Sequence, residues 1–267
     1  MKAEVCKLKT DRFTMDYCKF GEGEKAQVMI PGLSIMNLMP SANAIAEAYQ
    51  VLTKDYTFYV LERRDDLPDH YTVEDTARDS YEAIKELGLN KVTLCGASYG
   101  GMVAMSIALS HPELVEKVVV ASTSANITDE VYKVVGSWMD IADKGSREDL
   151  CMAFGEGLYP KNVFEDAKPL LKVMATGVSE EDLRRFTVLG RGMKGFSCIS
   201  RLKEMKCPFF VVGDEQDGVL GAASCREIEE VMKDHPGFEI YMYDGYGHAA
   251  FDLAPDFKER ILAFLRK

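Results

Sequence analysis

The sequence predicts an α/β fold: a mostly parallel central sheet of about eight strands, flanked by helices and carrying an inserted helical cap. Two observations lead to this class. Short runs rich in Val, Ile, Phe and Tyr alternate with helical patterns along most of the chain, as in sheets built from strand–helix–strand units. The alternation is interrupted over residues 125–201, where only helical patterns occur. We therefore expect a core formed by residues 1–124 and 202–267, and a cap formed by residues 125–201.

The expected strands begin with an edge hairpin. Segments 4–9 and 13–19 alternate polar and apolar residues, which is typical of antiparallel strands with one solvent-exposed face. The later runs lack clean alternation, so we expect them to be buried on both faces of the sheet. These runs are residues 27–30, 57–62, 91–95, 117–122, 209–212 and 239–243.

Helical patterns fill the intervals between the strands. Ser41 is a candidate cap for a helix that runs to about Thr53, and Thr72 with Asp75 forms a capping-box pattern for a helix that ends near Gly88. The other core helices are expected over residues 99–109, 225–233 and 256–266. The interrupted region is expected to form helices over residues 129–143, 148–154, 163–175 and 180–189.

The composition is that of a globular protein and excludes several classes of function. Hydrophobic residues make up 47% of the 267 residues and charged residues 28%, which rules out wholesale disorder and fibrous repeats. The net charge of -11 repels phosphate backbones and anionic lipids, so we expect no nucleic-acid partner. No run approaches the roughly 20 apolar residues of a membrane span. Since the N-terminus also lacks the apolar core of a signal peptide, we expect a cytoplasmic protein. Its oligomeric state stays open.

The cysteines and histidines do not suggest a metal or cofactor site. Seven cysteines, an odd number without a CxxC pair, are expected to be free thiols, and the four histidines are too scattered for a metal cluster. The segment Gly190–Gly195 matches the GxGxxG pattern of dinucleotide sites, but no strand–helix–strand unit surrounds it. We interpret this segment as a flexible loop of the cap and expect no cofactor.

The strongest local signal is the pentapeptide Gly96–Gly100, which reads Gly-Ala-Ser-Tyr-Gly. It matches G-x-S-x-G and lies between a predicted buried strand and a predicted helix of small residues, which is the context of a nucleophile elbow. In such a turn Ser98 occupies strained backbone at the sheet edge, beside the N-terminus of the helix. Both glycines are needed because a side chain there would collide with the neighbouring strand and helix. Ser98 is therefore the candidate nucleophile.

A serine nucleophile needs a base, and the base needs an orienting carboxylate. His248 follows the predicted strand 239–243 and Asp217 follows the strand 209–212, so both lie in loops at the sheet edge that carries Ser98. The order Ser, Asp, His along the chain is that of the elbow class. Asp214 lies in the same loop and is the alternative acid. We prefer Asp217 because it extends further from the strand end.

Together these segments resemble the α/β-hydrolase family. The resemblance rests on the stretches GASYGG, GDEQDGVLG and GYGHAAF, in this order, and it covers nearly the whole chain. It implies that Ser98 is the nucleophile, Asp217 the acid and His248 the general base, and that the helical insertion is the family's cap domain. It also implies an oxyanion hole formed by two backbone N–H groups. These are the amides of Tyr99, after the nucleophile, and of Leu33, in the loop after residues 27–30.

Two segments depart from the family pattern. Pro31 and Gly32 stand where many members have His-Gly, and residues 63–68 (Arg-Arg-Asp-Asp-Leu-Pro) stand where Gly-x-Gly-x-Ser is common. The resemblance therefore assigns the family and no subfamily.

Apolar side chains in the cap, and in the loop after Pro31, are candidates for the substrate pocket. A cap that lies over Ser98 must supply part of the roof, which implies a largely apolar pocket. The cap arginines at positions 184, 185 and 191 could meet a substrate carboxylate, but a solvated cap face is the preferred interpretation. The candidate lining residues are Met36, Trp138, Met139, Phe186 and Met193.

These residues predict a serine hydrolase that acts on a small, largely apolar carboxylic ester, thioester or lactone through an acyl-enzyme. The substrate would be a small molecule, and the reaction needs neither a metal nor a cofactor. Two alternatives remain open. The same triad could serve a hydrolase or lyase that cleaves a carbon–carbon bond, or the protein could be a ligand-binding receptor or interaction protein that makes little use of its triad.

Overall fold

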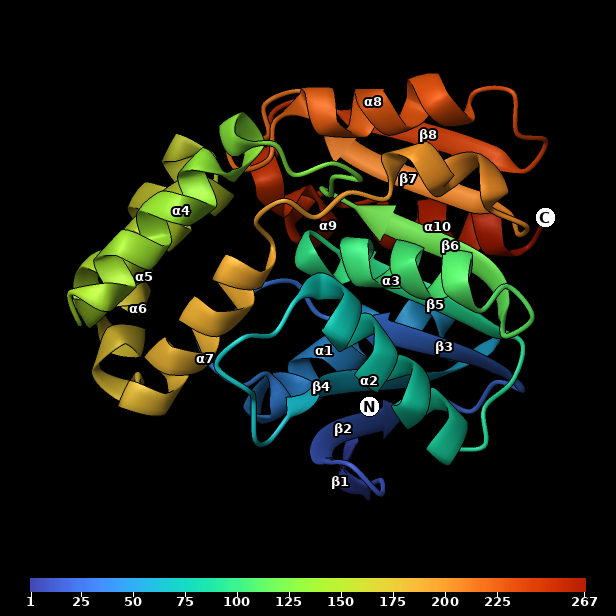
Figure 1. Ribbon diagram of the computed structural model, residues 1–267, viewed down its shortest axis with the longest axis horizontal. Helices are drawn as coiled ribbons and strands as arrows, with labels where there is room; N and C mark the ends of the chain where they lie inside the picture. Colours follow the sequence, from blue (N-terminus) through green and yellow to red (C-terminus); the bar gives the residue numbers. More distant parts are fainter.

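A single eight-stranded sheet forms the centre of the molecule (Figure 1). The computed structural model describes all 267 residues and places the strands in the order β1-β2-β4-β3-β5-β6-β7-β8. β1 and β2 pair antiparallel, as do β2 and β4, and every other neighbouring pair is parallel. The strands are β1 (Glu4–Lys9), β2 (Thr14–Phe20), β3 (Lys25–Ile30), β4 (Tyr56–Arg64), β5 (Val92–Ala97), β6 (Val115–Ala121), β7 (Phe209–Asp214) and β8 (Phe238–Tyr243). The predicted α/β fold with an antiparallel edge hairpin is confirmed.

Both faces of the parallel part are covered, as the lack of alternation predicts. Successive residues of β6 enter different hydrophobic cores: Val118 packs on one side of the sheet and Val119 on the other. The first core lies beneath α2 (Val73–Glu86), α3 (Tyr99–Ser110) and α8 (Ala222–Met232). The second lies beneath α1 (Ala42–Ala48) and α10 (Phe257–Leu265), and the short α9 (Ala250–Leu253) adjoins it. None of the helices combines the length and apolarity needed to cross a lipid bilayer.

Four consecutive helices between β6 and β7 form a separate group beside the carboxyl ends of the parallel strands (Figure 1). They are α4 (Asp129–Asp143), α5 (Arg147–Leu158), α6 (Lys161–Gly177) and α7 (Glu180–Gly192), which match the four helices predicted there. The chain enters and leaves this group through two paired segments. The amide of Ile127 donates to the carbonyl of Phe196 at 2.7 Å, and the amide of Cys198 donates to the carbonyl of Ala125 at 2.8 Å. We call this two-stranded connection the neck.

One core helix is shorter than predicted. The single helix expected from Ser41 to Thr53 is α1 alone, flanked by the 3-10 turns Met39–Ser41 and Gln50–Leu52. Tyr49 ends α1 with backbone angles of φ −102° and ψ 11°, and its ring packs 5.6 Å from that of Phe58. Ser41 makes no capping hydrogen bond. The capping box of Thr72 and Asp75, by contrast, is present at the start of α2.

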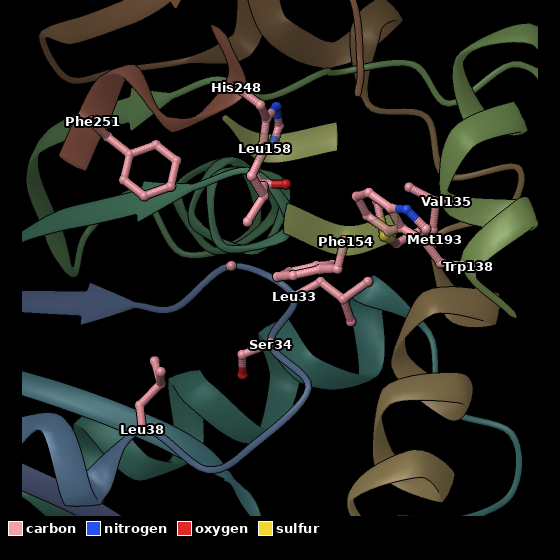
Figure 2. Close-up of a pocket in the computed structure, with 12 residues that line it drawn as sticks. Leu33, Ser34, Leu38, Val135, Trp138, Phe154, Leu158, Met193, His248 and Phe251 are labelled. Atoms are coloured by element: carbon pink, nitrogen blue, oxygen red, sulfur yellow. The ribbon is translucent and has the colours of Figure 1, made fainter. Parts of the chain in front are cut away.

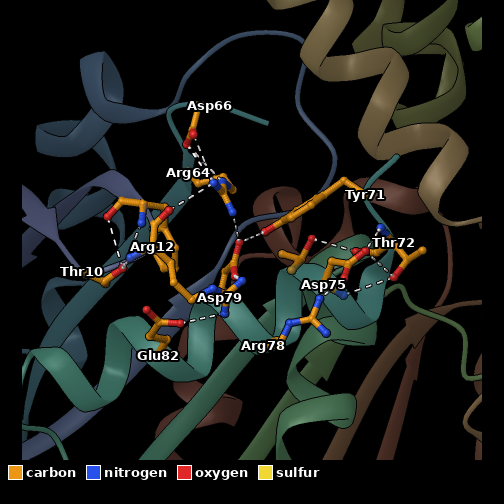
Figure 3. Close-up of polar contacts among 12 residues, drawn as sticks. Thr10, Arg12, Arg64, Asp66, Tyr71, Thr72, Asp75, Arg78, Asp79 and Glu82 are labelled. Carbon is orange, nitrogen blue, oxygen red and sulfur yellow. Dashed lines mark hydrogen bonds and ion pairs between the residues drawn. The ribbon is translucent and has the colours of Figure 1, made fainter. Parts of the chain in front are cut away.

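A buried carboxylate ties the edge hairpin to the rest of the core (Figure 3). Asp79 of α2 is 1% exposed and accepts a hydrogen bond of 2.6 Å from the Tyr71 hydroxyl. It also accepts from the guanidinium groups of Arg12, at 3.1 Å, and Arg64, at 3.3 Å. One side chain therefore joins the β1–β2 connection, the end of β4 and the start of α2.

Candidate active site

Ser98 occupies the turn between β5 and α3, in a conformation that few residues other than glycine adopt. Its backbone angles are φ 54° and ψ −122°. The predicted reason for both flanking glycines is confirmed. A Cβ at Gly96 would lie 2.2 Å from the carbonyl oxygen of Gly100, and a Cβ at Gly100 would lie 2.0 Å from that of Ile30. The turn is therefore compressed between α3 and β3, and Ser98 is held at the strand end.

Hydrogen bonds around the turn fix the orientation of Ser98. Its carbonyl accepts from the amide of Gly101 at 2.9 Å and from the buried hydroxyl of Thr123 at 2.7 Å. Ser98 is also the first flanking residue of α3, so the partial positive charge of the helix N-terminus lies beside it. That position favours negative charge on the Ser98 side chain and on a group bound next to it.

His248 and Asp217 form a buried pair. The Nδ1 atom of His248 lies 2.9 Å from both carboxylate oxygens of Asp217, and the two residues are 1% and 9% exposed. The amides of Val219 and Leu220 donate to the same carboxylate at 2.8 and 3.1 Å. Burial opposes ionisation of Asp217, but the charge and hydrogen bond of His248 and these two amides outweigh it and lower the pKa of the carboxyl. With Nδ1 directed at Asp217, Nε2 is the nitrogen of His248 that can exchange a proton.

Asp214, the alternative acid, has a different contact set. It is 1% exposed and accepts from the amide of Gln216 at 2.8 Å and from the amide of Tyr246 at 2.8 Å. These bonds connect the loop after β7 to the loop after β8. Asp214 therefore braces the two loops, and the carboxylate that contacts His248 is that of Asp217.

Ser98 and His248 open onto one cavity of about 180 Å³ between the sheet edge and the helical group (Figure 2). No lysine, arginine, aspartate or glutamate lines it. The floor comes from the core and the roof from α4, α5 and the turn after α7. The lining residues are Gly32, Leu33, Ser34, Leu38, Ser98, Val135, Trp138, Phe154, Leu158, Met193, His248 and Phe251.

Two of the five candidate lining residues, Trp138 and Met193, lie on this cavity, and three lie elsewhere. Phe186 is fully buried and meets Phe154 edge-on at 5.7 Å, so it supports the lining from behind. The other two face different neighbours. Met139 packs against Gly190 between α4 and α7, and Met36 lies in a separate small niche beside Arg185.

Four further residues of the lining were not predicted from the sequence: Val135, Phe154, Leu158 and Phe251. The spacing of these residues along their helices gave part of the information needed to predict them. Val135 and Trp138 are three residues apart on α4, and Phe154 and Leu158 are four apart on α5, so each pair shares a helix face. Which face meets the cavity depends on how the helices dock on the core.

The three arginines of α7 named above all have protein partners outside the cavity. Arg184 donates to the carbonyl of Leu67 at 2.6 Å and to Asp69 at 2.9 Å. Arg191 pairs with Asp143, and Arg185 lies 3.6 Å from the buried carboxylate of Glu62. These contacts fasten α7 to the core and to α4, and none provides an anchor for a substrate carboxylate.

The segment Gly190–Gly195 differs from the flexible loop that we predicted. Its first three residues complete α7. A Cβ at Gly192 would lie 2.1 Å from the carbonyl oxygen of Tyr71, and one at Gly190 would lie 2.4 Å from the sulfur of Met139. These glycines therefore permit close packing of a helix end. No strand precedes them, so the arrangement of a dinucleotide site is absent.

Of the two predicted oxyanion residues, Leu33 lines the cavity, and Tyr99 follows Ser98 directly in the chain. Tyr99 is the first residue of α3, and the first amides of a helix have no partner within it. Leu33 lines the cavity, and its amide donates no hydrogen bond within the protein. Across the whole structure, no group of three His, Cys, Asp or Glu side chains could hold a metal ion, and all seven cysteines are free thiols.

Fold and turn together define a class of protein. The family model for the alpha/beta hydrolase fold matches residues 42–255, so this chain belongs to the alpha/beta hydrolase family and is a hydrolytic enzyme. The family predicted from the sequence is confirmed.

The chain is also similar to individual proteins of known sequence or structure. The protein named "Putative carbamate hydrolase RutD" from Rhizobium rhizogenes is 24% identical over 231 residues, which cover 85% of this chain and 86% of that protein. The serine hydrolase BPHL of Homo sapiens is 26% identical over 220 residues, 80% of this chain and 70% of that one. A solved alpha/beta hydrolase from a Medee basin deep-sea metagenome library has a TM-score of 0.86 at 18% identity and matches over 98% of both chains. At that identity the structural likeness shows a shared fold.

Proposed function

We propose that this protein is a serine hydrolase that cleaves a small, largely apolar carboxylic ester, thioester or lactone through an acyl-enzyme. One observation carries the proposal. Ser98, on its strained turn, and His248, held at Nδ1 by Asp217, open onto the same cavity. A serine beside a histidine that a carboxylate orients is the arrangement of acyl-transfer enzymes.

In the proposed reaction, Oγ of Ser98 attacks the substrate carbonyl while Nε2 of His248 accepts the hydroxyl proton. The carbonyl oxygen becomes an oxyanion, which the amides of Leu33 and Tyr99 stabilise. When the intermediate collapses, the leaving group departs with the proton from His248. A water molecule then loses a proton to His248 and attacks the acyl-enzyme, which releases the acid and restores the serine. The ionised Asp217 stabilises the imidazolium in each step.

The size and lining of the cavity support a small neutral substrate. About 180 Å³ is less than the volume of most drug-sized ligand sites, and the absence of a charged side chain from the lining leaves an acidic substrate without an anchor. We further propose that residues 125–201 act as a cap that selects the substrate. Its support is that this segment contributes five lining residues: Val135, Trp138, Phe154, Leu158 and Met193.

The two alternatives are less well supported. Cleavage of a carbon–carbon bond in an acidic substrate would require a polar anchor, and the three cap arginines that could supply one are engaged elsewhere. A receptor that makes little use of its triad would not require the strained conformation of Ser98, which costs roughly 1–3 kcal/mol in stability.

Labelling with a fluorophosphonate probe tests the proposal. We expect the folded protein to be labelled on Ser98 and the Ser98→Ala variant to remain unlabelled. If folded wild-type protein does not react while a serine esterase does under the same conditions, the proposed function is wrong and the receptor alternative gains support.

A substrate panel then tests the chemical class. It should contain p-nitrophenyl esters from acetyl to octanoyl, a thioester, a lactone and a succinyl ester. It should also contain a p-nitrophenyl carbamate, because one similar curated protein is named for carbamate hydrolysis. We expect short neutral acyl groups to have the highest kcat/KM and the acidic succinyl ester the lowest. A preference for the succinyl ester would contradict the substrate class.

A further inference from the structure

Arg63 is a buried side chain that contacts both segments of the proposed oxyanion hole. It lies near the end of β4 and is 4% exposed. Its Nη2 donates to the carbonyl of Pro31 at 2.6 Å and to that of Gly32 at 3.2 Å, and both carbonyls belong to the loop that carries Leu33. Its guanidinium carbon lies 5.1 Å from the centre of the Tyr99 ring. One arginine therefore contacts Tyr99 and the two residues that precede Leu33, and the amides of Tyr99 and Leu33 are those that would bind the oxyanion.

The contacts with Pro31 and Gly32 constrain the direction of the Leu33 amide. In a planar trans peptide, the C=O and the following N–H point to opposite sides. The bond from Arg63 to the Gly32 carbonyl therefore turns the Leu33 N–H away from Arg63. Gly32 adjoins the nucleophile, since a Cβ on it would lie 3.5 Å from the Cβ of Ser98. Gly32, Leu33 and Ser98 also line the same cavity, in which the oxyanion would form.

The charge of Arg63 has no counter-ion. Its guanidinium forms no salt bridge, and its buried Nε has no hydrogen-bond partner. The carboxylate of the adjacent Glu62 is engaged with the amides of Leu38 and Arg63 and lies 3.6 Å from Arg185. A buried cation held by two carbonyl oxygens and one aromatic ring, without a carboxylate partner, incurs a desolvation cost that no ion pair offsets. The arrangement places an uncompensated positive charge behind the loop beside Ser98.

We propose that Arg63 is a positioning residue for the oxyanion hole. It orients the Gly32–Leu33 peptide, supports the Tyr99 ring at the start of α3 and contributes positive potential where negative charge develops. The inference rests on the proposed hydrolase function and adds a residue to it. Arg63 touches neither Ser98 nor the substrate, so its effect is transmitted through the loop. Its neighbour Arg64 points elsewhere, to Asp66 and Asp79, and makes a matched control.

The test compares Arg63→Gln with Arg64→Gln, each of which removes one positive charge from adjacent positions. For each variant, kcat and KM are measured with the best ester of the panel, together with the inhibition constants of two ligands. One ligand is a trifluoromethyl ketone that matches the acyl group and forms a tetrahedral adduct with Ser98. The other is the primary amide of the acid that the reaction releases, which binds in the cavity without forming an oxyanion. A third variant, Arg63→Lys, keeps the positive charge but loses the planar guanidinium group that can donate several hydrogen bonds at once.

For Arg63→Gln we expect kcat to fall about 10- to 100-fold, since loss of a whole oxyanion donor costs about 100- to 1000-fold. The affinity for the trifluoromethyl ketone should fall by the same factor, with KM and the affinity for the amide changed less than about threefold. Arg63→Lys should lie between wild type and Arg63→Gln. Arg64→Gln should unfold at lower temperature and keep kcat within about twofold.

The proposal is overturned if Arg63→Gln keeps both kcat and ketone affinity, or if it weakens ketone and amide equally, because a general disturbance of the pocket would do the latter. If Arg63→Gln does not fold, the same comparison is made with Arg63→Lys, and unchanged ketone affinity there overturns it. Failure of the proposed hydrolase function would give a different result in these measurements. In that case the wild-type protein itself forms no adduct with the ketone or with the fluorophosphonate.

Discussion

Replacing each of two neighbouring aspartates by asparagine gives the sharpest test of the site. Asp217 contacts His248 and Asp214 does not, although both are buried and lie only three residues apart, Asp214 at the end of β7 and Asp217 in the loop that follows. In Asp217→Asn, the side-chain amide can donate to Nδ1, which favours the histidine tautomer with its proton on Nε2, the nitrogen that must accept the serine proton. We expect kcat to fall about 10⁴-fold, which corresponds to about 5 kcal/mol of transition-state stabilisation.

Asp214→Asn should have the opposite profile. It weakens hydrogen bonds to the amides of Gln216 and Tyr246, so we expect a loss of about 1–3 kcal/mol in the free energy of unfolding and a kcat within about tenfold of wild type. The assay is hydrolysis of the best panel ester below the melting temperature of each variant, with urea unfolding in parallel. A larger loss of kcat in Asp214→Asn than in Asp217→Asn would refute the assignment of the acid.

Three further predictions concern the pocket, the thiols and the stability of the fold. Phe154→Ala should widen the cavity and raise kcat/KM for the octanoyl ester about tenfold relative to the acetyl ester, as the substrate panel would record. Cys6 is only partly buried while the other six cysteines are buried, and burial raises the pKa of Cys95 and Cys198 to about 12, so Ellman's reagent at pH 8 should titrate one thiol rapidly in native protein and seven in denaturant. Asp79→Asn should lower the free energy of unfolding by about 3 kcal/mol in urea titrations and leave kcat unchanged, since it separates the hairpin from α2 without touching the cavity.

The pH dependence of stability follows from the lowered pKa of Asp217. A carboxyl whose pKa is lower in the folded than in the unfolded protein binds protons more weakly when folded, so its contribution to stability is complete above the ordinary pKa of about 4 and is lost as the pH falls through the folded value. Wild type should therefore exceed Asp217→Asn in free energy of unfolding at pH 7, and the difference should shrink below about pH 4. A difference that grows in acid would show that the sign of the shift is wrong.

The helices, the strands and the turn around Ser98 could be predicted because the sequence features that produce them are local. Runs buried on both faces, the Thr72 capping box and the glycines around Ser98 each depend on contacts within a few residues or on one obligatory steric clash. The helix after Ser41 was predicted too long because its end depends on a tertiary contact, the packing of the Tyr49 ring on Phe58. Local propensity contains no information about that contact.

The lining of the cavity could be predicted only in part for the same reason. Trp138 and Met139 are adjacent on α4, and only the docking of α4 decides that the first faces Ser98 and the second packs on Gly190. The position and contacts of Arg63 could not be predicted from the sequence at all. Its partners are two backbone carbonyls about thirty residues earlier in the chain, and carbonyls leave no mark in a sequence.

The neck has a consequence for how this protein can change. Because residues 125 and 198 are hydrogen-bonded neighbours, a change in the length of the segment between them need not alter the order or pairing of the strands. Ser98, Asp217, His248 and Arg63 all lie outside that interval, whereas five of the side chains that enclose the cavity lie inside it. Under the proposed function, the residues that break the bond and five of the residues that select the substrate therefore lie in different stretches of the chain. A graft of a foreign segment between these two residues would therefore change what the enzyme cleaves while leaving how it cleaves intact.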